Sequence, residues 1–473
     1  MGPREGRVSP TGIDVRASTG TTPPVRDRRA DRAAAIALFV VLFLAYNANG
    51  REIGSFDTQP TKFAARELLL RGTLALNHVV GATPQYAERW GFINAADGRY
   101  RSIYSPVPSL VAAGITWPLW KIGLIDIRAA VAPGLMAKLT ASLLIAISTV
   151  LAFFAARAYT SRGEALLVAL GLGLGTGFWS TASQTLWQTE TSTLGLTMAA
   201  LAFAGTHDTL GSRRAIVIGI GLGLAGVTRP QLAPAVTLIL AGTWLRTNAW
   251  NAIAASTIVA VFAVVLATAN VRWFGHALGA LPLLQAHNAL IHNSGASFRL
   301  SAEGWLGLLV SPNRGLLIFS PVALVAASGL RPAMRAGFRA PLVWCVLAAA
   351  GQYALYATYS VWWGGHTYGP RYMLDVLPLL VPAAAAGMTW LMSSAILRSA
   401  AALALAWSIL VAATGAFCYP AEQWNVVPND IDRNHARLWS WSDMQIVRCW
   451  KTGLSGQNFT LLDWGTVRRA TTR

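Results

Sequence analysis

One aspartate follows the first apolar stretch of the chain closely, in the run Ser55-Phe-Asp-Thr-Gln-Pro60. The next stretch, 61–70, is amphipathic at helical spacing, so Asp57 or Thr58 is a candidate cap for a helix with Pro60 in its first turn. A carboxylate in this place is also suited to act as a general base. The two interpretations are compatible, because a capping position also holds a side chain in place.

Four cations lie near the ends of other apolar stretches: Lys138, Arg229 in Thr-Arg-Pro-Gln, Arg314 in Ser-Pro-Asn-Arg-Gly-Leu-Leu, and Arg371 in Trp-Trp-Gly-Gly-His-Thr-Tyr-Gly-Pro-Arg-Tyr. A single arginine at such a place usually extends to lipid headgroups as an anchor. Several together are able to converge on one anionic headgroup, since a guanidinium matches the geometry of a phosphate. We therefore expect these cations to bind a phosphate.

One carboxylate with several cations favours transfer of a group from a lipid phosphate to a hydroxyl. The leaving phosphate is a weak base that needs no general acid, and cations stabilise its charge. The acceptor hydroxyl needs a single base, whereas a glycosidase needs two carboxylates at a defined separation. Metal ligands are not expected, because the sequence has no CxxC or HExxH motif.

Five more side chains are candidates for contact with a substrate. They are Tyr104, Gln188, Glu190, His366 and Tyr368. For Gln188 and Glu190, which neighbour Trp187 at a turn, structural packing is the favoured alternative.

The composition is that of a polytopic membrane protein. Of the 473 residues, 54% are hydrophobic and 12% are charged, against about 25% charged in soluble domains. The net charge of +18 is spread between the apolar stretches, which excludes a nucleic-acid-binding face. We expect an all-α fold with eleven spans of roughly 20 residues. They are 33–49, 133–156, 164–183, 190–206, 214–228, 232–246, 250–271, 311–330, 340–360, 373–392 and 399–417.

The arginines between these spans determine the expected orientation. With 105–120 taken as a proline-bounded interfacial helix, short loops rich in arginine alternate with long acidic ones, which places the N-terminus inside and the C-terminus outside. Residues 1–32, which hold seven arginines, are expected to be a disordered cytoplasmic tail, with a cleaved signal peptide as the alternative. The transmembrane domain is then 33–417, with outer loops 50–132 and 272–310, and 418–473 is an outer tail.

Two further sets of residues each have two competing interpretations. The glycine runs 171–177 and 219–226 resemble nucleotide-binding loops, but both lie within spans, where glycine allows close helix packing. Cys418 and Cys449 both fall on the oxidising outer side, so a disulfide between them and two unrelated thiols are equally open.

The order of short motifs resembles bacterial GT-C-type membrane glycosyltransferases that use polyprenyl-phosphate sugars, similar to the protein mannosyltransferases and aminoarabinose transferases. The motifs are the early Asp57, Tyr104-Ser-Pro-Val-Pro108, Gly175-Thr-Gly-Phe-Trp179, Arg314-Gly-Leu-Leu and the Gly-Pro-Arg-Tyr run that ends at Tyr372. The resemblance covers about residues 33–450 and implies that Asp57 is the acidic catalytic residue and that the arginines bind the lipid phosphate. Thr58 stands where many relatives carry a second acidic residue, so the resemblance implies no metal site there.

The leading hypothesis is a multi-pass glycosyltransferase of a bacterial plasma membrane, with its active site outside. No cofactor is expected, and a divalent metal ion is an alternative without support in the sequence. The expected partners of the enzyme are a polyprenyl-phosphate-sugar donor, membrane lipids and a glycan, lipid or protein acceptor. The alternatives are a transporter or flippase of a lipid-linked glycan, for which the sequence shows no internal repeat, and a polysaccharide polymerase or ligase with a diphosphate donor.

Overall fold

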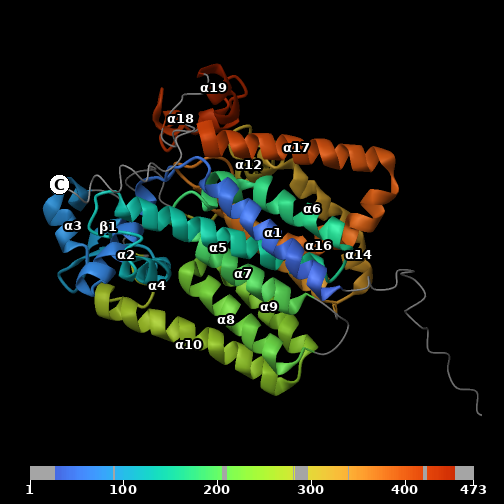
Figure 1. The fold of residues 1–473 in the computed structure, drawn as a ribbon, viewed down its shortest axis with the longest axis horizontal. Helices are drawn as coiled ribbons and strands as arrows, with labels where there is room; N and C mark the ends of the chain where they lie inside the picture. Colours follow the sequence, from blue (N-terminus) through green and yellow to red (C-terminus); the bar gives the residue numbers. More distant parts are fainter. Residues whose placement is uncertain are drawn as a thin grey trace, which may run out of the picture.

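The computed structural model describes residues 27–88, 91–204, 210–280, 282, 297–338, 340–418 and 423–452, and they are predominantly helical (Figure 1). The first half contains α1 (Arg28–Asn47), α2 (Gln59–Arg71), α3 (Asn77–Ala82), β1 (Phe92–Asn94), β2 (Tyr100–Ser102), α4 (Val107–Lys121), α5 (Ala132–Ala156), α6 (Arg162–Leu174), α7 (Thr189–Phe203) and α8 (Ser212–Thr228). The second half contains α9 (Ala233–Arg246), α10 (Ala249–Phe274), α12 (Ala302–Val310), α13 (Leu316–Phe319), α14 (Leu330–Ala336), α15 (Pro341–Thr358), α16 (Leu377–Ser393), α17 (Ala395–Cys418), α18 (Gln423–Val426) and α19 (Gln445–Thr452).

Short 3-10 turns connect several of these helices. They are Phe56–Thr58, Pro84–Glu88, Pro230–Leu232, Pro321–Gly329, Arg371–Asp375 and His435–Trp439, and a π-helical turn covers Phe178–Ala182. The strands β1 and β2 form an antiparallel hairpin in which Ile93 pairs with Arg101.

Five of the described helices, α1, α5, α10, α15 and α17, are long and apolar enough to cross a membrane. This is a membrane protein. Most predicted spans coincide with one helix, but α6 to α9 and α16 have only 13 to 17 residues, so the count of eleven spans stays a prediction.

Three predicted boundaries need correction. Span 311–330 is not one helix, because Pro312, Gly315 and Pro321 divide it into α13 and a 3-10 turn. Span 164–183 leaves α-helical geometry after Leu174 and continues as the π-helical turn. The first helix begins at Arg28, earlier than expected, because the Asp27 side chain caps it by accepting from the Arg29 and Ala30 N–H groups at 3.0 and 3.2 Å.

Residues between α1 and α5 gather at one end of the bundle, at the left of Figure 1, where α2, α3, α4 and the hairpin lie. We call this the loop end. The segment 105–120 is helical as predicted, and α4 packs against both α2 and α5. At the opposite end, Asp31 of α1 pairs with Arg157 and Arg162 at 3.1 and 2.8 Å, which ties α1 to the turn between α5 and α6.

The C-terminal segment 423–452 folds back onto the bundle, beside α17 at the top of Figure 1. Its side chains Trp424, Ile431, Leu438 and Ile446 are buried in the same hydrophobic core as α1, α7 and α15. The predicted outer tail is therefore, over its described part, a packed element of the fold.

Both glycine runs serve packing, as expected. Helices α7 and α8 touch through their backbones, since a Cβ on Gly221 would lie 2.5 Å from the Gly195 carbonyl oxygen. A Cβ on Gly173 would lie 2.9 Å from Leu42 and 3.0 Å from Thr149. These contacts leave no room for a nucleotide.

Replacing Gly221 with alanine is expected to lower the melting temperature of the purified protein in detergent, because the added methyl group overlaps the Gly195 carbonyl. Overpacking of this kind costs about 1–3 kcal/mol. Gly114→Ala in α4 is the matched control, because a Cβ there meets nothing within 4 Å. Its melting temperature should be unchanged or higher, and an unchanged value for Gly221→Ala would contradict the close contact.

Candidate active site

Asp57 lies at the loop end and forms an ion pair with Arg371. Its Oδ2 is 3.0 Å from Nη1 of Arg371, a residue 314 positions away in sequence. The carboxylate caps no helix: the Ser55 Oγ accepts from the Asp57 N–H, and Thr58 at the start of α2 makes no side-chain cap. The capping interpretation is therefore wrong, although Pro60 does lie in the first turn of α2.

Aromatic rings surround Arg371. Its guanidinium carbon lies 4.6 Å from the centre of the Trp187 ring and 5.7 Å from that of Tyr372. Burial by itself lowers the pKa of a guanidinium, but the adjacent Asp57 carboxylate raises the pKa of Arg371 above its ordinary value. Arg371 therefore remains a cation in an enclosed aromatic setting.

Tyr372 also connects Arg371 to a second arginine. The Arg229 guanidinium lies 5.7 Å from the Tyr372 ring centre and 5.9 Å from that of Tyr356. The two tyrosine rings stack with centroids 4.8 Å apart and an angle of 11°. Two of the four predicted cations, Arg229 and Arg371, thus flank one aromatic side chain.

Asp375 neutralises Arg229 and was not predicted from the sequence. Its Oδ2 lies 2.7 Å from Arg229 and accepts from the Tyr356 hydroxyl at 2.7 Å, while Oδ1 accepts from Ser192 at 3.0 Å. The sequence did contain a signal for Asp375. It is a lone carboxylate near the start of an apolar span, and such a residue needs a partner inside the bundle. The sequence gave no indication of which cation that partner is.

Several buried polar atoms around these arginines have no hydrogen-bond partner among the described residues. Three are N–H donors: Nε of Arg229, Nε of Arg371 and Nε1 of Trp187. The carboxylate of Glu190, which is fully buried, receives no side-chain hydrogen bond from the described residues. Buried polar groups are rarely left unpaired in folded proteins, so this concentration indicates a place where a polar ligand or water binds.

Tyr104 and Gln188 both lie at the loop end, and each is half-buried. A Cβ on Gly91 would contact both Pro60 of α2 and the Tyr104 ring, which places Tyr104 beside the start of α2. Gln188 precedes Thr189, whose hydroxyl accepts from Arg229 at 3.2 Å. These two predicted residues adjoin the arginine cluster.

Lys138 belongs to a separate polar cluster. Its buried ammonium donates to Asn49 Oδ1 at 3.0 Å and to Gln184 Oε1 at 2.6 Å. Close by in the fold, Glu52 pairs with Lys62 at 2.7 Å. The Lys138 contacts join the end of α1 to α5, and its part in phosphate binding stays a prediction.

Arg314 is fully buried and holds the C-terminal segment in place. Its guanidinium donates five hydrogen bonds, to the carbonyls of Asn313, Trp363 and Gly365 and to the side chains of Asn425 and Gln445. Because the side chain has five N–H donors in all, none is left for a ligand. The expectation that Arg314 binds a phosphate is therefore corrected to a structural role.

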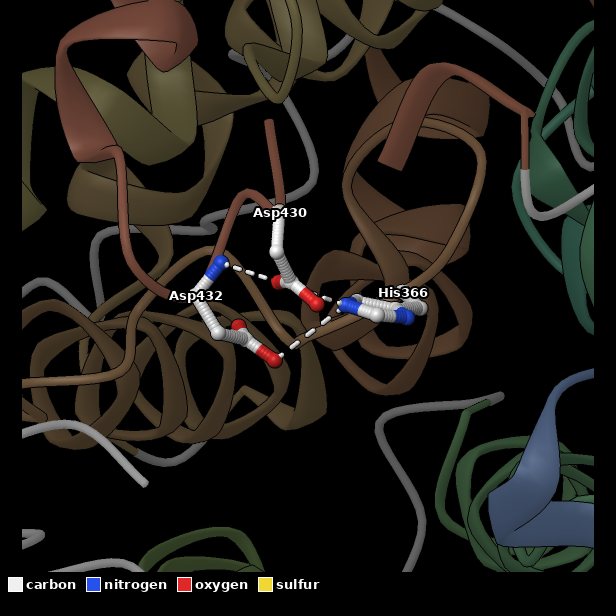
Figure 2. Close-up of side chains that lie close together, drawn as sticks. All are labelled: His366, Asp430 and Asp432. Carbon is white, nitrogen blue, oxygen red and sulfur yellow. Dashed lines mark hydrogen bonds and ion pairs between the residues drawn. The ribbon is translucent and has the colours of Figure 1, made fainter. Parts of the chain in front are cut away.

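Tyr368 and His366 have polar partners of their own. Tyr368 is buried, and its hydroxyl donates to the Val411 carbonyl at 3.0 Å. The His366 Nε2 lies 3.1 Å from Asp430 and 3.3 Å from Asp432 (Figure 2). Burial alone lowers the pKa of an imidazole, but Asp432 and Asp430 together raise the pKa of His366 to about 9.

The side chains of Cys418 and Cys449, the pair considered for a disulfide, lie outside the described residues. The cysteine whose side chain is described, Cys345, is buried and free.

Comparison with known proteins finds similar chains among solved structures. No protein-family model matches the chain, and no curated protein sequence matches it. Among solved structures, the chain is similar to ArnT from Cupriavidus metallidurans bound to undecaprenyl phosphate, with 15% identity and a TM-score of 0.48, over 83% of this chain and 71% of that one.

Proposed function

We propose that the chain is a glycosyltransferase that moves a sugar from a polyprenyl-phosphate donor to an acceptor hydroxyl on the outer face of a bacterial plasma membrane. Asp57 is the general base, and Arg371 with Arg229 binds the donor phosphate. The observation that carries the proposal is the Asp57–Arg371 pair beside three buried N–H donors that have no partner within the described part of the chain.

The phosphate binds on the aromatic side of the two arginines. Its oxygens accept from Nε of Arg371, Nε of Arg229 and Nε1 of Trp187, which have no other acceptor among the described residues. Charge-assisted hydrogen bonds of this kind are about twice as strong as neutral ones. Arg371 contributes most, because Asp57, its carboxylate partner among the described residues, is 26% exposed, whereas Arg229 is held by the fully buried Asp375.

Transfer then requires one proton movement. The acceptor hydroxyl attacks the anomeric carbon while Asp57 takes its proton, and the bond from that carbon to the phosphate oxygen breaks. The bonding electrons stay on the phosphate, where Arg371 stabilises the charge. Binding of the phosphate to Arg371 also weakens the hold of that arginine on Asp57, which makes the carboxylate a better base.

The remaining contacts are assigned from position. Tyr104, Gln188 and Glu190, which adjoin the arginine cluster, contact the sugar. An apolar cavity of about 290 Å³ between α6, α16 and α17 holds part of the prenyl chain. Leu377, which lies two residues after Asp375, lines this cavity. In this proposal the prenyl chain in the cavity is therefore adjacent to the donor phosphate. In this proposal the loop end faces outside, in keeping with the basic loops at the opposite end.

Asp57→Asn is expected to lower the rate of sugar transfer by about 10²–10⁴-fold, because the amide takes no proton. The assay is transfer of radiolabelled sugar from synthetic polyprenyl-phosphate donors by purified protein. Asp126→Asn, at a half-buried position on the same loop, is the matched control and should keep full activity. Full activity in Asp57→Asn would remove the assigned base. Movement of lipid across liposomes without a covalent product would establish the transporter alternative.

Arg371→Lys is expected to raise the KM for the donor while leaving the melting temperature nearly unchanged, because lysine keeps the charge but loses the planar fork. The loss of one charged hydrogen bond, about 1.5–3 kcal/mol, corresponds to a rise of roughly 10- to 100-fold. Arg314→Lys should behave in the opposite way, with a lower melting temperature and little change in KM. A raised donor KM in a stably folded Arg314→Lys protein, with none in Arg371→Lys, would contradict the assignment.

A further inference from the structure

A second group of side chains with coordinating atoms lies apart from the arginine cluster. His366 comes from the loop between α15 and α16, and Asp430 and Asp432 come from the C-terminal segment (Figure 2). One ligand atom from each residue lies within 4.8 Å of the others. The three side chains are partly buried, and two segments 64 residues apart supply them.

The backbone around these residues holds them in place. His366 follows Gly364 and Gly365, which have φ values of 76° and 73°, in the left-handed region that favours glycine. On the other side, the Asp432 N–H donates to Asp430 Oδ1 at 2.9 Å, and the Trp363 indole donates to Asp432 Oδ1 at 2.8 Å. Asp432 Oδ2 is thereby directed at the imidazole, as outer contacts direct the ligands of metal sites.

Two carboxylates share one ring nitrogen of His366. Nε2 of an imidazole carries at most one hydrogen, yet two carboxylates face it at 3.1 and 3.3 Å. Two carboxylates this close repel unless a positive charge lies between them, and either a protonated His366 or a bound metal ion supplies that charge. A metal bound at roughly 2.0–2.2 Å by tetrahedral ligands has those ligands about 3.3 Å apart. The two observed separations agree with that value.

We propose that His366, Asp430 and Asp432 bind one divalent transition-metal ion, with Zn²⁺ as the best match. An imidazole nitrogen combined with two carboxylate oxygens suits zinc better than Mg²⁺ or Ca²⁺, which prefer all-oxygen sites. Three protein ligands leave a fourth position for water, which reaches the site because the Asp430 side chain is 37% exposed.

The metal ion connects two parts of the protein. One is the loop that carries Arg371, and the other is the C-terminal segment. His366 and Arg371 belong to one short loop, and Arg314 already ties the same loop to Asn425 and Gln445 through its five hydrogen bonds. The metal therefore adds a second connection between this loop and the C-terminal segment. This role does not depend on the proposed transfer reaction.

The test uses the full chain in detergent, purified through a tag without histidine and freed of metal by a chelator. Titration with Co²⁺ should give one equivalent bound with the visible absorption of a four-coordinate ion, displaced by Zn²⁺, and Zn²⁺ should raise the melting temperature. Absence of stoichiometric Co²⁺ and Zn²⁺ binding to the wild-type protein would overturn the proposal without any variant.

Two variants locate the site. His366→Gln and Asp432→Asn should abolish stoichiometric Co²⁺ binding, whereas His78→Gln, at an exposed histidine of α3, should bind like the wild type. Trp363→Phe should weaken affinity by roughly 10- to 100-fold, as loss of an outer contact does. Wild-type affinity in a folded His366→Gln protein would place the metal elsewhere. These readouts need no sugar transfer, so they remain decisive whether or not the proposed activity is found.

Discussion

Charges enclosed in a helical bundle must be paired, and here the pairing determines which distant segments meet. Asp57 meets Arg371, and Asp375 meets Arg229 and the Tyr356 hydroxyl. Leaving one such charge without its partner costs about 3–5 kcal/mol, more than most packing contacts contribute. The loop end is therefore built around these pairs, and the helices that reach it are positioned by them.

Hydrogen-bond donors that have no partner among the described residues remain in the same region, where a ligand can accept from them. The N–H donors at Arg229, Arg371 and Trp187 lie beside the ion pairs, and Tyr372 lies between the two guanidinium groups. A rigid structural cluster would satisfy its own donors, as Arg314 does with five hydrogen bonds. This contrast between Arg314 and Arg371 is the strongest local indication of which arginine meets a ligand.

The sequence was sufficient for the class of protein and for most helices, because hydropathy and proline positions are local properties. It also identified Asp57, Arg229 and Arg371 as residue types suited to phosphate chemistry. It misassigned Arg314 because the number of acceptors around a cation depends on segments far away in the chain, such as Gln445 for Arg314. Asp375 was missed for the same reason, since its partner lies at the end of another helix.

The backbone contact between α7 and α8 limits how this sequence can diverge. Thr189 and Glu190 begin α7 and Arg229 follows α8, so the separation of these polar residues depends on how closely the two helices approach. Gly195 and Gly221 set that approach, each against the other's carbonyl oxygen. A larger residue at either position cannot be offset by a smaller one at the other, because both are already glycine. A sequence with a larger residue at either position must shift the whole helix. That shift changes the spacing of the polar groups at the end of the helix.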